Sequence, residues 1–316
     1  MTLDPQTKAL LDEIKEADGP QYWEMPLDEA RAFFDTISAD LATPAPAIGA
    51  TEDRMVPVDG GEIAVRIYQP SEAARGGAKT LPLVLHFHGG GFVLGSLNAY
   101  DSVCQNLCER TPAVVVSVDY RLAPEHRFPT ALDDSIAATR WAAAEAAGFG
   151  ADAGRMALVG DSAGGCIVAG VTQALKADAS VDVAYQVLVY PVTDVGTMDT
   201  NSYNKFSEGY LLSKEMMEWF GSCYLSNDAE KLDPRASPLR AESFDGLPPA
   251  LVITAGFDPL LDEGVAYVKA LEGAGVDVRL VNYEHQIHAF WSLGAAIDEA
   301  KDALGRAAKA IRDAVR

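Results

Sequence analysis

The residues best suited to do chemistry surround Ser162. The run Gly-Asp-Ser-Ala-Gly at residues 160–164 follows the apolar residues 156–159, and a helix is predicted at residues 167–176. A strand, a tight turn with glycines and a helix make a nucleophile elbow, which holds a serine hydroxyl out at the carboxyl edge of a sheet. The pattern predicts that Ser162 is a nucleophile. On this short motif alone, a serine in an ordinary glycine-rich loop is the alternative.

A glycine-rich loop upstream of the elbow supplies a second part of such a site. Apolar residues 83–85 lead into His-Phe-His-Gly-Gly-Gly at residues 86–91, the pattern of a strand that opens into an oxyanion loop. Glycine N–H groups can approach a substrate oxygen with no Cβ in the way, so they suit stabilisation of a negative oxygen. We expect the oxyanion donors to be the N–H groups of Gly89, Gly90 and Ala163.

A serine nucleophile also needs a general base held by a third group. Of the five histidines, His285 and His288 are expected in a loop after the last predicted strand, which suits the chain order serine, acid, histidine. For the acid, Asp258 is the first carboxylate after the predicted strand at residues 250–254. Asp262 is the alternative, and a role at the start of a helix would also explain it. The residue types alone leave both choices open.

Three motifs together are similar to one known family. The His-Gly-Gly-Gly at residues 88–91, the Gly-Asp-Ser-Ala-Gly-Gly at 160–165 and the Asp-Tyr-Arg-Leu-Ala-Pro-Glu at 119–125 resemble the hormone-sensitive-lipase-like esterases, in the bacterial branch with a Gly-Asp-Ser-Ala-Gly elbow. This resemblance implies an α/β-hydrolase fold. It also implies hydrolysis of carboxylic esters with short to medium acyl chains, through an acyl-enzyme and without a cofactor.

The resemblance also selects among the open residues. His288-Ala289-Phe290 is similar to the family's His-Gly-Phe, with alanine in the place of glycine, and Asp258 matches the family's Asp-Pro-Leu. It therefore implies a catalytic triad of Ser162, His288 and Asp258. The alanine adds one methyl group near the base and bears on the backbone freedom of the loop. No metal site is expected, because no carboxylate or cysteine cluster completes either histidine pair.

The elements that must position these residues alternate along the chain. Helices are predicted between most strands, for example at residues 100–109, 131–147 and 264–271. Such alternation predicts a mostly parallel sheet of about eight strands with helices on both faces, opened by a hairpin around Asp-Gly-Gly at residues 59–61. The predicted strands are residues 55–58, 62–68, 83–87, 113–118, 155–159, 184–190, 250–254 and 276–282.

Two segments do not fit this alternation. Residues 1–48 carry apolar residues at helical spacing, and residues 192–246 contain no evident strand but a helix at 214–224 that is rich in aromatic residues. An insertion at the carboxyl end of a strand lies over the catalytic edge, and the resemblance implies an N-terminal cap. We expect both segments to be cap helices over a catalytic domain of residues 49–191 and 247–316; helices that only pack on the sheet are the alternative. The residues expected to contact the substrate are Phe92, Leu211 and Trp219.

The composition limits the partners. The chain has 25 Lys and Arg against 46 Asp and Glu, a formal net charge of −21. This acidity argues against nucleic acid or an anionic membrane surface, so a small-molecule ester is the expected partner. With no visible secretory signal, no membrane-spanning run and four cysteines in no framework, we expect a cytoplasmic protein. The resemblance implies a homodimer paired through the last strand and helix, with residues 276–282 as the edge.

Two other functions use the same features. Some plant hormone receptors are hormone-sensitive-lipase-like proteins that have lost the catalytic histidine, whereas this chain has Ser162, Asp258 and His288, which favours an enzyme. The same triad can also cleave a lactone, a carbamate or an aryl amide. Esters are favoured because their leaving group needs less help from a general acid.

Overall fold

The protein is described here by a computed structural model of residues 2–316, so Met1 of the predicted N-terminal cap lies outside it. Its centre is one eight-stranded sheet with the strand order β1-β2-β4-β3-β5-β6-β7-β8, which confirms the predicted α/β architecture. The strands are β1 (Ala50–Val58), β2 (Gly61–Gln69), β3 (Leu81–Phe87), β4 (Val114–Val118), β5 (Ala151–Asp161), β6 (Val183–Val189), β7 (Ala250–Phe257) and β8 (Val278–Ile287).

The sheet is mostly parallel. Strand β2 pairs antiparallel with β1 and with β4, and β4, β3, β5, β6, β7 and β8 pair in parallel. The predicted hairpin turns at Gly60, whose φ of 74° is one that glycine adopts without strain. Every residue of β4 and β7 is buried, as expected for strands covered on both faces.

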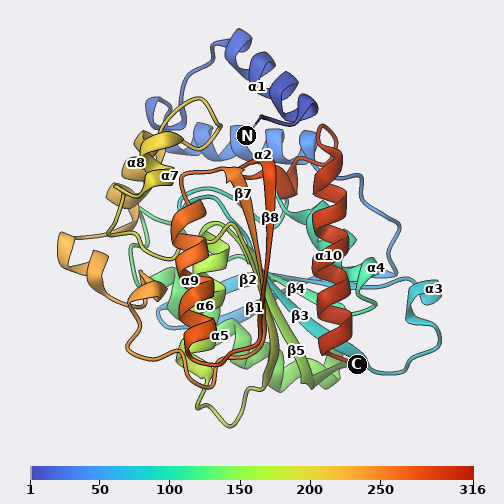
Figure 1. Ribbon diagram of the computed structural model, residues 1–316. Helices are drawn as coiled ribbons and strands as arrows, with labels where there is room; N and C mark the ends of the chain where they lie inside the picture. The colour runs from blue at the N-terminus through green and yellow to red at the C-terminus, as the bar shows by residue number, and fades with distance from the viewer. Residues whose placement is uncertain (1) are drawn as a thin grey trace.

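Helices cover both faces of the sheet (Figure 1). Helices α5 (Thr130–Glu145), α6 (Ala163–Leu175) and α9 (Leu261–Gly273) pack on one face, and α4 (Asp101–Arg110) and α10 (Asp298–Ala314) pack on the other. Each face thus has its own apolar core. The other short helices outside residues 1–48 and 192–246 are α3 (Glu72–Arg75), η2 (Ala146–Phe149) and η5 (Phe290–Ser292).

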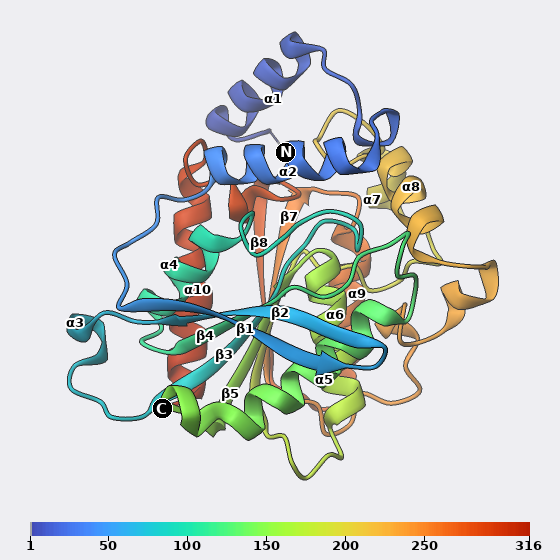
Figure 2. The ribbon, with the colours of Figure 1, turned by 180° about the vertical axis from the view of Figure 1, so that it is seen from behind.

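The helices outside the alternation gather at one end of the sheet. Helices α1 (Pro5–Ala17) and α2 (Leu27–Leu41) lie across the ends of β7 and β8, as both views show (Figures 1 and 2). Helix α8 (Lys214–Tyr224) lies beside them and has the predicted bounds. The shorter elements of these two segments are η1 (Tyr22–Glu24), α7 (Asn201–Lys205), η3 (Asp228–Leu232) and η4 (Pro238–Arg240).

Helix α2 is tied to the body of the protein by Arg31. Its guanidinium donates to the backbone oxygens of Val93 and Ala123, each at 2.9 Å, and makes two hydrogen bonds of 2.8 Å with the carboxylate of Glu125. The segment after β4 is itself held by Arg121, which pairs with the buried carboxylate of Asp134. The motif at residues 119–125 is therefore a brace between α2 and the loop after β3.

The last strand is longer than predicted. Strand β8 continues to Ile287, so the expectation that His285 lies in a loop after the strand is wrong. The pairing of β7 with β8 shifts register between Ala255 and Phe257. At that point Gly256 lies against the backbone of Glu284, where a Cβ would overlap the Glu284 carbonyl. Within residues 2–316, no helix is both long and apolar enough to cross a membrane.

Candidate active site

Ser162 occupies a strained turn between β5 and α6. Its φ of 55° and ψ of −118° are unusual for a residue with a side chain. Side chains at the flanking glycines would collide with backbone: a Cβ on Gly160 would overlap the oxygen of Gly164, and one on Gly164 would overlap the oxygen of Phe87. The glycines of the motif are thus what allows the turn to form between two packed strands.

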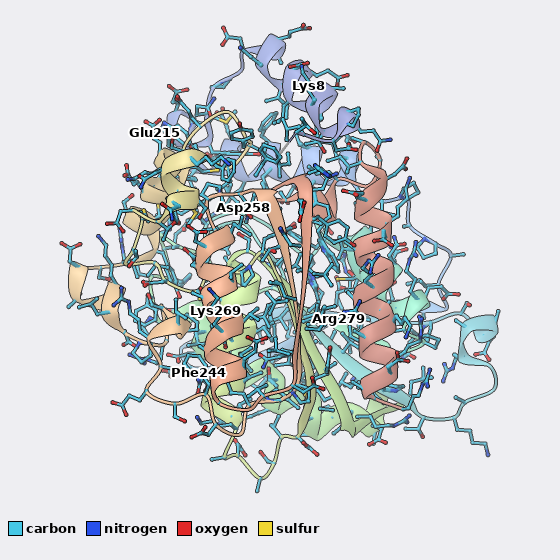
Figure 3. The ribbon with its side chains drawn as sticks, in the orientation of Figure 1. Lys8, Glu215, Phe244, Asp258, Lys269 and Arg279 are labelled. Carbon is cyan, nitrogen blue, oxygen red and sulfur yellow. The ribbon has the colours of Figure 1, made fainter. Side chains whose placement is uncertain are left out.

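Three side chains distant in sequence meet at this turn. His288 Nε2 lies 3.0 Å from Ser162 Oγ, and His288 Nδ1 lies 2.8 Å from Asp258 Oδ2. All three are buried, with exposed fractions of 8% for Ser162, 6% for His288 and 0% for Asp258. Because a carboxylate only accepts, Nδ1 carries the proton and Nε2 is left to accept one from the serine. Figure 3 marks Asp258 at the end of β7 that faces the N-terminal helices.

The alternative histidine and carboxylate lie elsewhere. His285 Nδ1 is 2.8 Å from the backbone oxygen of Thr2, at the N-terminal segment. Asp262 lies in the first turn of α9 and accepts a 2.9 Å hydrogen bond from the N–H of Ser202. That position is the helix-start role expected for it.

The oxyanion loop differs from the prediction at its first glycine. The N–H of Gly89 donates to Asp161 Oδ1 at 3.1 Å, so assigning Gly89 as an oxyanion donor is wrong. Gly90 and Gly91 line the same cavity as Ser162, and within residues 2–316 their N–H groups donate to no protein acceptor. Ala163 begins α6, so its N–H has no partner in the helix. Gly91 is the donor candidate that sequence reasoning missed.

Two apolar cavities meet at Ser162. The larger is also lined by His288, Ala289 and residues of α1 and α2. The smaller is lined by Met217, Phe220 and Tyr224 of α8. Gly91, Ser162 and Phe220 line both.

The predicted contact residues divide between these cavities. Phe92 lines the smaller cavity and Leu211 the larger. Trp219 lines neither among the described residues, so the prediction for Trp219 is not supported. Its neighbour Phe220 is the aromatic residue of α8 that borders both cavities, with the two rings 5.0 Å apart.

Burial controls the charges around the site. It lowers the pKa of His86 to about 3 and that of His88 to about 4, so both rings are neutral near pH 7. It raises the pKa of Asp161 to about 6, against the opposing effect of the Tyr100 hydrogen bond. Across residues 2–316, no three His, Cys, Asp or Glu side chains are grouped to hold a metal ion.

The sheet order and the serine turn at its carboxyl edge define an α/β-hydrolase. A family model for the alpha/beta hydrolase fold matches residues 84–292. Ethyl acetate hydrolase of Pseudomonas putida is 39% identical over 289 residues, which cover 90% of this chain and 89% of that protein. The carboxylic ester hydrolase LipN of Mycobacterium tuberculosis is 44% identical over 259 residues, covering 80% and 67%.

Solved structures agree over nearly the whole chain. An ester-hydrolase from the metagenome of Lake Arreo has a TM-score of 0.94 at 40% identity, covering 99% of both chains. A hyperthermophilic esterase from Pyrobaculum calidifontis has a TM-score of 0.93 at 38% identity, again covering 99% of both. The chain belongs to the hormone-sensitive-lipase-like family of α/β-hydrolase esterases, and it is a carboxylesterase.

Proposed function

We propose that this carboxylesterase cleaves esters of short to medium acyl chains through an acyl-enzyme on Ser162. His288 serves as general base and then general acid, and Asp258 orients the imidazole. The observation that carries this proposal is the hydrogen-bond chain from Asp258 through His288 to Ser162, with distances of 2.8 and 3.0 Å. Its order and direction are those of a serine-hydrolase triad.

The proposed reaction follows the serine-hydrolase scheme. Ser162 Oγ attacks the ester carbonyl carbon while its proton passes to His288 Nε2, and Asp258 stabilises the imidazolium that forms. The negative oxygen of the tetrahedral intermediate accepts hydrogen bonds from the N–H groups of Gly90, Gly91 and Ala163. The C–O bond to the alcohol then breaks, and the alkoxide takes the proton from Nε2. In the second half, water gives a proton to Nε2 as its oxygen attacks the acyl carbon. The bond from that carbon to Ser162 Oγ then breaks, Oγ takes the proton back from Nε2, and the carboxylic acid leaves.

The position of His288 suggests which part of the ester each cavity holds. The departing alcohol must lie where Nε2 can protonate it, and His288 lines only the larger cavity. The alcohol group therefore occupies the larger cavity and the acyl chain the smaller one. The walls of Met217, Phe220 and Tyr224 limit the length of the acyl chain. Short acyl groups on bulky, apolar alcohols are the substrates that fit this division.

The helices over the carboxyl edge are proposed to form a cap of residues 1–48 and 192–246. Helix α1 contributes Leu10 and Ile14 to the wall of the larger cavity, and α2 contributes Phe34 and Ile37. Helix α8 provides one wall of the smaller cavity. Covering the reacting atoms with apolar side chains excludes bulk water and strengthens the hydrogen bonds to the oxyanion.

The assembly and location are further parts of the proposal. Strand β8 ends the sheet and has a strand neighbour on one side only among the described residues, with Leu280 on it 37% exposed; an antiparallel homodimer through β8 would cover this edge. Light scattering measures the oligomer directly. A cytoplasmic location is supported by four free cysteines, and the net charge of −21 argues against a nucleic-acid partner.

The test is a panel of p-nitrophenyl esters from acetate to decanoate. Ser162→Ala should lower kcat by about a thousandfold or more at every chain length, with an unchanged melting temperature. Ser222→Ala, an equal change outside both cavities, is the matched control. A fluorophosphonate should label wild-type Ser162, identified by peptide mass. Undiminished turnover by Ser162→Ala would refute the assignment of the nucleophile. If the enzyme cleaves a lactone, carbamate or anilide faster than the esters, that bond and not the ester is its substrate.

A further inference from the structure

Asp161 is a buried carboxylate beside the nucleophile for which the mechanism above has no role. It is the last residue of β5, directly before Ser162, and its exposed fraction is 3%. Its Oδ1 accepts the N–H of Gly89 at 3.1 Å, and its Oδ2 accepts the hydroxyl of Tyr100 at 3.0 Å. Asp161 therefore links the nucleophile elbow to the oxyanion loop across 72 residues of sequence.

The rest of the loop is held by its carbonyl oxygens. The oxygen of His88 accepts the Tyr120 hydroxyl at 2.7 Å, and the oxygen of Gly89 lies 2.7 Å from His88 Nδ1, which must carry a proton to donate to it. The oxygen of Gly90 accepts two N–H groups, at 2.9 and 3.1 Å.

These contacts set the direction of the free N–H groups. In a trans peptide the C=O and N–H point in opposite directions. Because the oxygens of Gly89 and Gly90 are bound within the loop, the N–H groups of Gly90 and Gly91 point away from it. Gly89 is the first of the three glycines. The hydrogen bond from its N–H to Asp161 therefore fixes the position of the backbone that leads into Gly90 and Gly91.

Asp161 and Gly89 are tightly packed against each other. A Cβ built on Gly89 would lie 2.5 Å from Asp161 Oδ2 and 2.8 Å from the Tyr100 hydroxyl. The loop backbone thus packs directly on the carboxylate. We therefore expect a change in the position of the Asp161 side chain to move Gly89 and the peptide units that follow it.

We propose that Asp161 is a positioning residue for the oxyanion hole, which fastens the glycine loop to the elbow through the Gly89 N–H and so sets the distance from Ser162 to the donors of Gly90 and Gly91. This inference rests on the proposed function. Asp161 borders the larger cavity, but both its carboxylate oxygens are already used, by the Gly89 N–H and the Tyr100 hydroxyl. Its effect reaches the reaction through the donors, which act on the transition state more than on the bound ester.

The electrostatic state of Asp161 suits this role. Burial raises its pKa to about 6, while the bonds from Tyr100 and Gly89 and the nearby His288 act in the opposite direction. At pH 8 the carboxylate is therefore ionised and accepts both hydrogen bonds in their charge-assisted form. Asparagine keeps the shape and one acceptor oxygen for Gly89, and its NH₂ can donate to the Tyr100 oxygen. Alanine removes both contacts.

The experiment compares Asp161→Ala with Asp161→Asn at pH 8. We expect Asp161→Ala to lower kcat about 10- to 100-fold with KM changed less than about threefold, since one lost oxyanion donor lowers kcat by about 10²–10³. The kcat of Asp161→Asn should stay within about fivefold of the wild-type value. A trifluoromethyl ketone, whose adduct carries an oxyanion, should bind Asp161→Ala weaker by the same factor as the loss in kcat/KM. The carboxylic acid product should bind both variants equally.

Three outcomes would overturn the inference: wild-type kcat in Asp161→Ala, equal losses in both variants, or equal weakening of the ketone and of the acid product. If Asp161→Ala melts near the assay temperature, Tyr100→Phe/Asp161→Ala removes the unpaired hydroxyl and is compared with Tyr100→Phe/Asp161→Asn by the same measurements. Failure here is distinguishable from failure of the triad, because Ser162→Ala in the same assay tests the triad alone.

Discussion

The ring of Phe220 rests directly on Gly91, so closely that a Cβ at Gly91 would overlap the ring. Phe220 comes from α8 in the insertion after β6, and Gly91 from the loop after β3. Both residues border both cavities beside Ser162. The ring is thus the partition between the two cavities, and it packs on one of the two glycines proposed to hold the oxyanion.

Removing this partition should change the selectivity for acyl chains. Phe220→Ala joins the smaller cavity to the larger, so kcat/KM for p-nitrophenyl octanoate relative to acetate should rise by about tenfold, the effect of one to two kcal/mol of pocket contacts. The variant should also lose about 3 kcal/mol of unfolding free energy, because a buried phenylalanine is truncated. Trp219→Ala is the matched control, since Trp219 lines neither cavity. An unchanged dependence on acyl-chain length in Phe220→Ala would show that the Phe220 ring does not determine this selectivity.

Ala289 carries strain that glycine would not. Its φ of 67° is left-handed, a conformation that costs an L-residue about 1–2 kcal/mol. Glycine loses about 0.4–1 kcal/mol more entropy on folding, so relief of strain wins. Ala289→Gly should raise the unfolding free energy by up to about 1 kcal/mol in urea titrations. Ala144→Gly, on the exposed side of α5, should lower it by about 1 kcal/mol. A loss of stability in both would show that Ala289 is unstrained.

The position of each strand along the chain and the approximate place of each catalytic candidate could be predicted because buried parallel strands are short apolar runs. The order of the strands within the sheet was not predicted. The end of β8 could not. Residues 284–286 are Glu, His and Gln, which look like a loop in sequence, and they continue the strand because Gly256 on β7 gives their backbone room. The sequence of β8 alone does not show that a glycine of β7 will lie beside it.

The choice between Gly89 and Gly91 was also beyond local reasoning. The loop has three consecutive glycines with equal freedom, and the first is used by Asp161, a partner 72 residues away. Helix α8 posed a similar difficulty, because its aromatic residues occur on more than one face. Its neighbours in space decide that Phe220, and not Trp219, borders the cavities.

The two histidines at the end of β8 should separate cleanly by mutation. His288→Ala removes the base and should lower kcat by about a thousandfold or more. His285→Ala removes only the contact to the backbone of Thr2, so its kcat should stay within about fivefold of wild type by the same reasoning. Both are measured with p-nitrophenyl butyrate at pH 8. Inactivity of His285→Ala with a normal melting temperature would exchange the two assignments.

The raised pKa of Asp161 predicts how the free energy of unfolding changes with pH. The folded-state pKa is about 6, against 3.8 for an ordinary aspartate, so between these values the folded protein holds a proton that the unfolded chain has lost. Wild-type stability from this group therefore falls as pH rises from about 4 to about 6 and is constant above. Asp161→Asn does not titrate, so its unfolding free energy relative to wild type should rise across that window by on the order of 2–3 kcal/mol.

Urea titrations of both proteins at several pH values between 4 and 8 measure this difference. Asp178→Asn is the control, because the hydrogen bonds from Ser180 and Arg140 hold the pKa of Asp178 at about 2. Its contribution is present above the unfolded-state pKa and is lost only as pH falls below about 4, so the difference between Asp178→Asn and wild type should be flat over the range tested. A flat difference for Asp161→Asn as well would mean that the Asp161 carboxylate is ionised throughout, stabilised by Gly89 and Tyr100 beyond the effect of its burial.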